Sequence, residues 1–285
     1  MSGASGTEAD AGGESWGLQD VRVSFGRRVA LDCVSVPVEP SRVTVVVGGD
    51  GAGKSTCMRA LVGLLEPRAG TVRRPAKERT GYVPATAGLY EDLTVQENLD
   101  FCAGAYRLPA ARRGPSEAEM LERIGLAGAR DRLGGQLSGG MQRKLAVGLA
   151  LLHEPEMLVL DEPTTGVDPV SRAELWRLIS AAAAQGTAVA VATTYVNEAA
   201  RASSVVLLEA GRVLASGSPD AILRGVPGAV GTASGRERPA PLAWRRGADW
   251  RVWAPAGDLP AGASMTEPDF EDAVVVAALA GERGR

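Results

Sequence analysis

The residues best suited to chemistry form a glycine-rich loop that fits the pattern G-x-x-x-x-G-K-[ST], with the sequence Gly48-Gly49-Asp50-Gly51-Ala52-Gly53-Lys54-Ser55. Glycines let successive backbone N–H groups turn inward around phosphate oxygens, and a following helix adds the positive end of its dipole. We expect the Lys54 ammonium to reach the terminal phosphates of a nucleotide and the Ser55 hydroxyl to bind Mg²⁺. The alternative is a glycine-rich turn with a chance lysine. The apolar strand before the loop and the helical pattern after it argue against that alternative.

A second group that could do chemistry is the acidic pair Asp161-Glu162, which follows the apolar run of residues 157–160. This run predicts a buried strand, whose carboxyl end would place both acids at the crevice where α/β folds bind ligands. We expect Asp161 to hold Mg²⁺, in part through water, and Glu162 to orient and polarise an attacking water molecule. The alternative is that both acids are simply solvated at the end of the strand. The phosphate loop argues against this alternative.

The pattern of apolar residues indicates the elements that must position these groups. The β-branched run Val43–Val47 predicts a strand buried on both faces of a parallel sheet, and a helical pattern follows over residues 55–65. Strand, glycine loop and helix together predict the start of a βαβ unit. Further strands are predicted at residues 18–25, 29–38, 187–192 and 205–208, and a further helix at about 170–184.

The elements divide the chain into three parts. Residues 1–17 are dominated by Gly, Ser and Ala and predict a disordered tail. Residues 18–223 predict an α/β domain with a helical subdomain at about 93–152, interrupted by polar breaks such as Arg112-Arg113-Gly114-Pro115. Residues 224–285 predict a small C-terminal extension with a strand at 249–254 and a helix at 270–279.

Composition and charge limit the classes of function. Apolar residues make up 45% and charged residues 23%, as in an ordinary globular chain. Because 31 basic residues face 34 acidic ones, we expect no nucleic-acid partner held by charge. Three cysteines, Cys33, Cys57 and Cys102, lack metal-ligand spacing and suit a reducing compartment. The sequence shows no signal peptide and no apolar run long enough to span a membrane, which predicts a cytosolic chain.

A third motif brings these features together, with the sequence Leu137-Ser138-Gly139-Gly140-Met141-Gln142. It opens a predicted helix at residues 143–152, so Ser138 and the two glycines would present N–H donors at a helix N-terminus. With the phosphate loop before it and the acidic pair after it, the motif strongly resembles the signature of the ATP-binding subunits of ABC transporters. The resemblance covers about residues 18–220, and residues 267–273 are similar to the C-terminal extension of the drug-exporter branch.

The resemblance implies an α/β fold: a P-loop NTPase core of ABC ATPase type with a helical subdomain and a small C-terminal extension. It implies a dimer, with this chain or a related subunit as partner, that sandwiches ATP and Mg²⁺. It also implies a separate membrane permease, driven at the inner face of the cell membrane and in the direction of export. Residues 89–99 resemble the segment on which that permease docks, and they also predict a helix start capped by Thr94 with Glu97.

The resemblance also assigns residues. Glu162 and Lys54 are the implied catalytic residues, and Ser55 and Asp161 the implied Mg²⁺ ligands. The Phe25 ring is implied to stack on adenine, with core packing as the alternative. Gly166-Val167-Asp168 corresponds to the loop that links the two ATP sites across the dimer. The residues implied to contact ATP are Phe25, Gly48, Gly49, Asp50, Gly51, Ala52, Gly53, Lys54, Ser55, Thr56, Ser138, Gly139 and Gly140.

Two positions depart from the family pattern. Ala85 stands where the family has a glutamine that binds Mg²⁺, and Thr194 stands where it has a histidine that contacts the γ-phosphate. The chain's single histidine, His153, is expected to be exposed at a helix end. Because the loss of a preorganised donor costs ~10²–10³ in rate, we hypothesise that this site binds ATP well and hydrolyses it slowly. Its signature is intact and could still complete the site of a partner.

Three functions therefore remain at this stage. The first is an ATP-hydrolysing subunit that powers a permease. The second is a degenerate subunit, regulated by nucleotide and with little turnover, that completes a partner's ATP site. The third is a relative that acts on DNA or on the ribosome. The interval from Lys54 to Ser138 is too short for the long coiled coils of DNA-repair members, and a single set of motifs argues against the two-domain ribosomal members.

Overall fold

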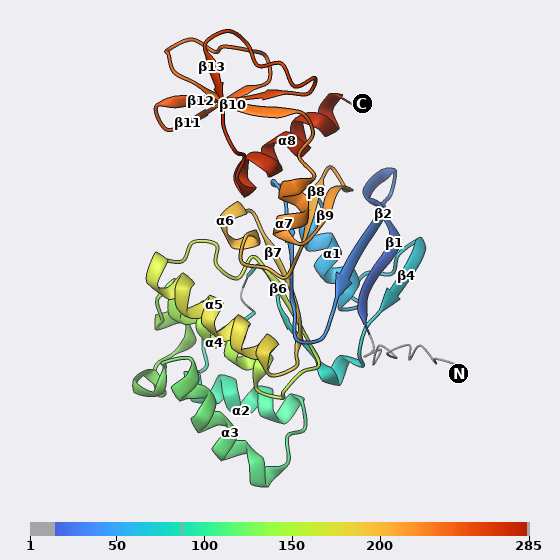
Figure 1. The fold of residues 1–285 in the computed structure, drawn as a ribbon. Coiled ribbons are helices and arrows are strands. Elements are labelled where there is room, and N and C mark those ends of the chain that lie inside the picture. Colours follow the sequence, from blue (N-terminus) through green and yellow to red (C-terminus); the bar gives the residue numbers. More distant parts are fainter. Residues whose placement is uncertain (1–14, 87, 284–285) are drawn as a thin grey trace, which may run out of the picture.

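A six-stranded, mostly parallel sheet forms the centre of the computed structural model, which describes residues 15–86 and 88–283 (Figure 1). In spatial order the strands are β5 (Thr80–Val83), β6 (Met157–Asp161), β7 (Ala188–Thr193), β3 (Val43–Val47), β8 (Ser204–Glu209) and β9 (Arg212–Gly217). β9 alone among these pairs antiparallel. Strands β3, β6 and β7 are buried along their whole length, as their continuous apolar sequences predict.

Helices cover one face of this sheet, and a helix with a second sheet covers the other (Figure 1). Around it lie α1 (Lys54–Leu61), α4 (Gly139–Leu151), α5 (Pro169–Ala184), α6 (Val196–Ala199) and α7 (Pro219–Arg224). The second sheet is antiparallel, in the order β2 (Arg28–Val38), β1 (Trp16–Phe25) and β4 (Ala69–Arg73). Val46 and Val159 pack toward α1 and the second sheet, whereas Val45 and Leu158 pack toward α4 and α5. Alternate side chains of each strand thus fill two separate cores.

The predicted elements of this core are confirmed with shifts at their ends. Strand β1 begins at Trp16 rather than at Leu18, because Trp16 already pairs with Val38. The tail predicted at residues 1–17 otherwise falls on residues 1–14, which lie outside the described residues. Helix α1 ends at Leu61 rather than at residue 65, since Gly63 adopts a φ of 75° and closes the helix.

The helical subdomain consists of α2 (Val95–Ala105), α3 (Ala110–Arg123) and α4, with short 3₁₀ turns at Ala127–Ala129 and Gly134–Gln136 between α3 and α4; a further 3₁₀ turn at Lys77–Arg79 precedes β5. Thr94 caps α2 as predicted: its hydroxyl accepts from Glu97 N at 3.1 Å, and Glu97 Oε2 accepts from Thr94 N at 2.8 Å. The predicted polar break at residues 112–115 is wrong, because these residues lie inside α3. Pro115 falls in the second turn, where its missing N–H removes a single backbone hydrogen bond.

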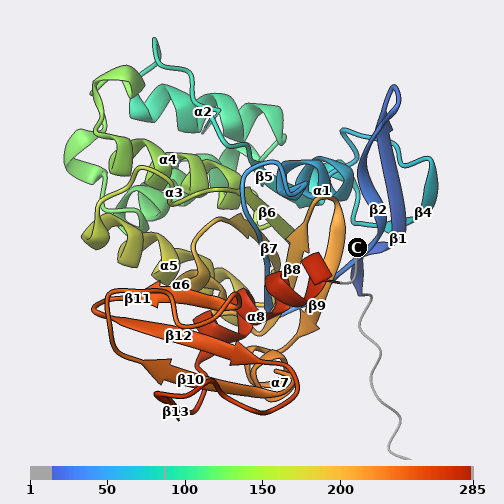
Figure 2. The same cartoon turned by 90° about the horizontal axis from the view of Figure 1, so that it is seen from above.

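The C-terminal extension builds a sheet of its own. Its strands lie in the order β11 (Ala243–Arg246), β12 (Asp249–Ala254), β10 (Ala229–Ala233) and β13 (Ala263–Met265), and its helix is α8 (Phe270–Arg283). The predicted strand at 249–254 is confirmed, and the predicted helix continues past residue 279. Figure 1 and Figure 2 both show α8 against this sheet, and in Figure 1 it lies between the sheet and α7. Val276 of α8 is fully buried against Val230 and Trp253.

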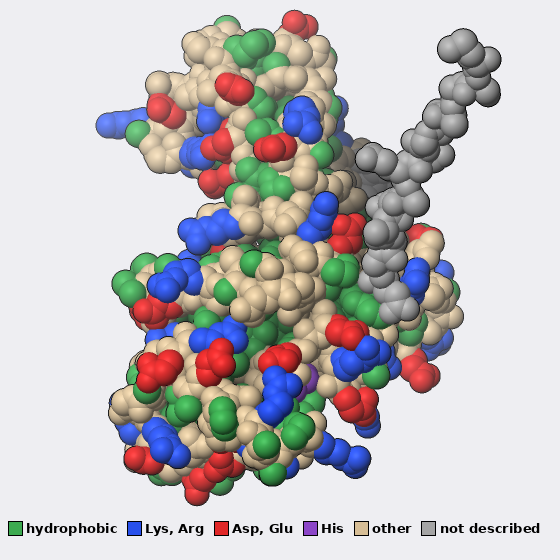
Figure 3. Space-filling view, turned by 60° about the horizontal axis from the view of Figure 1, so that its bottom comes forward, with side chains coloured by type: hydrophobic (Ala, Val, Ile, Leu, Met, Phe, Trp, Pro, Cys, Tyr) green, Lys and Arg blue, Asp and Glu red, His purple; other side chains and the backbone are tan. Residues whose placement is uncertain are grey.

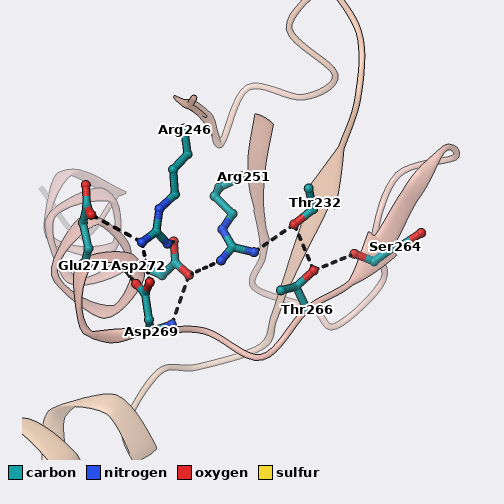
Figure 4. Close-up of polar contacts among 8 residues, drawn as sticks. All are labelled: Thr232, Arg246, Arg251, Ser264, Thr266, Asp269, Glu271 and Asp272. Carbon is teal, nitrogen blue, oxygen red and sulfur yellow. Dashed lines mark hydrogen bonds and ion pairs between the residues drawn. The ribbon is translucent and has the colours of Figure 1, made fainter. Parts of the chain in front are cut away.

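Arginines of the sheet hold the N-terminus of α8 through a buried carboxylate (Figure 4). Asp272 is fully buried; its Oδ1 lies 3.2 Å from Arg246 Nη1 and its Oδ2 lies 3.2 Å from Arg251 Nη2. Asp269 and Asp272 also accept each other's backbone N–H, and Arg246 pairs with Asp269. Arg251 in turn donates to Thr232 Oγ1 at 2.8 Å. The network therefore ties strands β10, β11 and β12 to one end of α8.

The surface carries mixed charge: basic and acidic side chains lie interspersed over the face drawn in Figure 3. Within residues 15–86 and 88–283, no helix combines the length and the apolar character that crossing a membrane requires.

His153 is not exposed as predicted. Its ring stacks on Tyr106 of the segment after α2, with centroids 3.6 Å apart, and both ring nitrogens are buried without a hydrogen-bond partner within the described residues. The expectation failed because the end of α4 turns toward α2, a tertiary contact that no local pattern reveals. Burial lowers the pKa of His153 to about 4, against a smaller opposing effect of the Thr80 backbone.

This burial predicts a loss of stability in acid. The folded pKa of His153 is about 4 and the ordinary value is 6.5. The unfolded chain therefore binds the proton first, and stability falls as the pH drops through this interval. His153→Phe keeps a flat ring against Tyr106 and is expected to lose less stability on acidification. Urea unfolding at about pH 7 and about pH 5 measures this difference. Equal losses in the two proteins would contradict it.

Candidate nucleotide-binding site

The phosphate loop joins β3 to α1, as predicted, and its backbone requires glycine. Gly51 and Gly53 have φ values of 77° and 110°, which side chains other than glycine rarely adopt. A Cβ on Gly48 would lie 2.2 Å from the Leu208 carbonyl oxygen of β8. The loop can therefore curl tightly above the sheet and leave its N–H groups facing the crevice at the N-terminus of α1.

Lys54 opens α1 and is 5% exposed. Its Nζ donates to the Gly49 carbonyl at 3.1 Å and lies 3.2 Å from Glu162 Oε1. The structure thus brings together the two predicted catalytic residues, which are far apart in the sequence. A buried ammonium held by two oxygens at the loop can exchange these contacts for phosphate oxygens.

Ser55 and Asp161 also meet, as the sequence predicted for a pair of Mg²⁺ ligands. Ser55 Oγ donates to Asp161 Oδ1 at 3.1 Å, and Asp161 Oδ2 is buried with no hydrogen-bond partner among the described residues. Burial raises the pKa of Asp161, and the Glu162 charge adds to this, while the Ser55 hydrogen bond, Arg59 and Lys54 oppose it. A cation at the orphaned oxygen would favour the charged carboxylate.

These oxygens fit Mg²⁺, which prefers hard oxygen ligands and one or two protein side chains beside phosphates and waters. Throughout the described chain, no group of three or more His, Cys, Asp or Glu side chains could hold a metal ion. Ser55 and Asp161 would therefore bind the ion together with oxygens of the ligand rather than in a closed protein cage.

A cavity of about 710 Å³ lies over the loop. Phe25 forms part of its wall and is 51% exposed, so the core-packing alternative for this residue is wrong. Arg28 and Val29 of β2 also line the cavity. The sequence reasoning missed these two residues, because only the pairing of β1 with β2 brings the hairpin to the loop.

Glu162 adopts an unusual backbone conformation, with a φ of 50°. For a residue other than glycine this conformation is uncommon, and such strain gathers at functional sites. Its second carboxylate oxygen accepts from Thr165 Oγ1 at 3.2 Å. The turn therefore points the carboxylate back toward Lys54 rather than along the strand.

The signature residues lie apart from this cavity, and Ser138, Gly139 and Gly140 are absent from its wall. Ser138 caps α4 by accepting from Met141 N at 3.3 Å. Gly139 has open space at its Cβ position, whereas a Cβ on Gly140 would lie 2.6 Å from Ser171 Oγ of α5. Within one chain the signature is thus a capped helix start that contributes nothing to the wall of the cavity over the phosphate loop.

The loop between β6 and α5 caps the latter helix with Asp168, whose Oδ1 accepts from Val170 N and Ser171 N at 3.0 Å each. A buried carboxylate that the sequence reasoning missed, Glu198 of α6, ties this region to the end of β7. It accepts from Thr164 Oγ1 and from Thr193 Oγ1, both at 2.7 Å. Thr194, in place of the expected histidine, is half-buried beside this junction.

Comparison with known proteins agrees with this arrangement. The profile of the ABC transporter family matches residues 31–165. The chain is 35% identical over 214 residues to the Nod factor export ATP-binding protein I of Paraburkholderia xenovorans (strain LB400), covering 71% of this chain and 70% of that protein. It is 40% identical over 208 residues to the probable multidrug ABC transporter ATP-binding protein YbhF of Escherichia coli (strain K12), covering 70% of this chain and 36% of that protein. The chain thus spans about a third of the length of this second relative.

Solved structures give the same result. The structure described as the ATP binding subunit of an ABC transporter superposes with a TM-score of 0.68 at 30% identity, covering 74% of this chain and 92% of that one. The ATP-binding cassette MJ0796, at 23% identity and a TM-score of 0.63, shares the fold over 71% of this chain and 98% of its own. On this fold and these similarities, the chain belongs to the family of ABC transporter ATP-binding proteins.

Proposed function

We propose that this chain binds and hydrolyses ATP, closes with a second ATP-binding subunit around the nucleotide, and powers a separate membrane permease. The observation that carries the proposal is the meeting of Lys54 with Glu162 and of Ser55 with Asp161 at one phosphate loop. The two relatives described above are named for multidrug transport and for Nod factor export. The second of these names supports export as the direction of transport. We place the action of the chain at the inner face of the cell membrane, beside the permease.

Each residue receives a role from its position. The N–H groups of residues 48–56 and the Lys54 ammonium bind the phosphates, and the exposed Phe25 ring offers a face for the adenine. Ser55 and Asp161 would hold Mg²⁺, which would supply positive charge against the phosphates. Glu162 orients a water molecule for attack on the γ-phosphate and accepts its proton. The strained turn at Glu162 keeps the carboxylate beside Lys54.

The signature supports a dimer. Ser138 and Gly139 present N–H donors at the start of α4, and this helix end does not reach the cavity of its own chain. We therefore assign the donors to the γ-phosphate held by a second subunit, which is a copy of this chain or a related one. In this assignment residues 18–223 form the ATP-binding domain, residues 93–152 its helical subdomain, and residues 224–285 an extension.

A small apolar cavity beside the loop after β5 supports the docking of the permease. It measures about 170 Å³ and is lined in part by Tyr90 and Phe101, each 51% exposed, whose ring centroids lie 4.7 Å apart. Exposed aromatic side chains around a cavity favour an apolar segment of a partner. The same loop starts at the end of β5, which pairs with β6, the strand that ends in Asp161, and so gives the permease a short route to the nucleotide site.

Light scattering in solution tests the proposed closure of two copies. In a Glu162→Gln background, which should retain ATP, we expect ATP with Mg²⁺ to double the molar mass. The further change Gly139→Arg should abolish this doubling, since it places a large side chain at an open position on the proposed dimer face. A monomer at saturating ATP, or doubling that survives Gly139→Arg, would contradict closure of two copies through the signature.

A further inference from the structure

An arginine of the signature helix contacts the loop after β5 at the position where the expected glutamine is missing. Arg143 lies on α4, and its half-buried guanidinium extends to the loop after β5. Its Nη2 donates to the Ala85 carbonyl at 2.6 Å, and its Nη1 donates to the Pro84 carbonyl at 3.5 Å. The planar fork of a guanidinium suits two successive carbonyl oxygens better than an ammonium does. This loop is therefore held by a side chain from α4.

The same guanidinium lies within electrostatic range of the acids of the site. Burial lowers the pKa of Arg143, and the charges of Glu162 and Asp161 act in the opposite direction. Lys54 and Arg59 also act on Asp161. Arg143 differs from both because it comes from the helix that the signature opens. A shift of α4 would thus move a positive charge relative to the acidic pair and would pull on the loop at Ala85.

We propose that Arg143 is a positioning residue for ATP hydrolysis, which fixes the loop at Pro84 and Ala85 against the signature helix and sets the charge that faces Glu162 and Asp161. Ala85 offers no polar side-chain atom, so the connection between this loop and the acids runs through Arg143. The inference rests on the proposed ATPase function. It adds a residue that acts through the loop and through electrostatics without touching the nucleotide.

Neutral and charged replacements of Arg143 separate its hold on the loop from the effect of its charge on Glu162 and Asp161. Arg143→Gln removes both the fork and the charge, and we expect kcat to fall about tenfold, as for the loss of other outer contacts of metal sites. The KM for ATP should change less, because the phosphate loop is intact. Because the variant has one cation fewer near Asp161, the Mg²⁺ concentration that gives half-saturation should fall about threefold. Arg143→Lys removes the fork and keeps the charge. It should therefore lower kcat while leaving the Mg²⁺ dependence near that of the wild type.

The experiment measures ATP turnover, and also calorimetric ATP binding at a series of Mg²⁺ concentrations. It compares the wild type with both variants and with Ala85→Gln/Arg143→Gln, in which a side-chain amide returns to the loop and part of the lost turnover should be recovered. Arg177→Gln, on the exposed side of α5, is the matched control. Thermal unfolding and ATP binding without Mg²⁺ show that each variant is folded.

The proposal is overturned if folded Arg143→Gln matches the wild type in turnover and in Mg²⁺ dependence. It is also overturned if that variant needs more Mg²⁺ than the wild type, as simple loosening of the site would cause. A wild type that binds ATP without turnover would instead refute the proposed ATPase function. The Mg²⁺ dependence of ATP binding would still decide the electrostatic role of Arg143.

Discussion

Glu162→Gln is expected to lower Mg-ATP turnover by about 10²–10⁴-fold while leaving ATP binding intact. Glutamine keeps the shape of the side chain, but it can neither accept a proton nor polarise a water molecule as a carboxylate does. The residue touches Lys54 on one side and Thr165 on the other. Because both neighbours can still bond to the amide, we expect the strained turn to persist.

Phosphate release measures the turnover of this variant, and calorimetry measures its ATP affinity. Glu174→Gln is a matched control, since Glu174 is an acid of α5 that pairs with Lys144 at 2.9 Å and lines no part of the nucleotide cavity. The control should keep wild-type turnover. If Glu162→Gln retained more than about a tenth of the wild-type rate, Glu162 would not be the general base.

Asp272→Ala is expected to destabilise the C-terminal extension by about 3–5 kcal/mol, the usual cost of removing one partner from a buried ion pair. The carboxylate is fully buried and faces Arg246 and Arg251 (Figure 4). Arg246 retains Asp269 after the change, whereas Arg251 loses its ion-pair partner within the described residues. The N-terminus of α8 also loses the side chain that accepts from Asp269 N.

Tryptophan fluorescence follows the unfolding of this part, because Trp244, Trp250 and Trp253 all lie in its sheet. Glu267→Ala changes an exposed acid of the same segment and serves as the control. We expect a separate early urea transition in Asp272→Ala and none in the control. If Asp272→Ala lowered the free energy of unfolding by less than about 1 kcal/mol, the prediction would be wrong, and the attraction between Asp272 and the arginines would be cancelled by the cost of desolvating them.

Local patterns predicted the parts of this protein whose structure is fixed by short stretches of chain. The run Val43–Val47 and the glycines after it indicated a buried strand and a tight loop, and both lie where expected. The capping of α2 by Thr94 depends on a spacing of three residues and was also predicted correctly. The meeting of Ser55 with Asp161 follows because Asp161 ends the parallel strand β6, and Ser55 comes just after the loop at the carboxyl end of the parallel strand β3.

Features that depend on distant contacts were not predictable in this way. Strands β10 and β11 are short and carry glycine or arginine among apolar residues, and they are held by packing on α8. His153 stacks on Tyr106, and Arg143 reaches Ala85 from another element. Each of these contacts joins residues that the sequence keeps far apart, so no periodicity could reveal them.

The most direct test of the whole account is the Mg-ATP turnover of the purified chain beside that of Lys54→Ala. The account predicts measurable turnover in the wild type. It predicts loss of both ATP binding and turnover in the variant, because the only lysine of the phosphate loop is removed. Equal turnover in the two proteins, or a wild type that binds ATP and never hydrolyses it, would contradict the account.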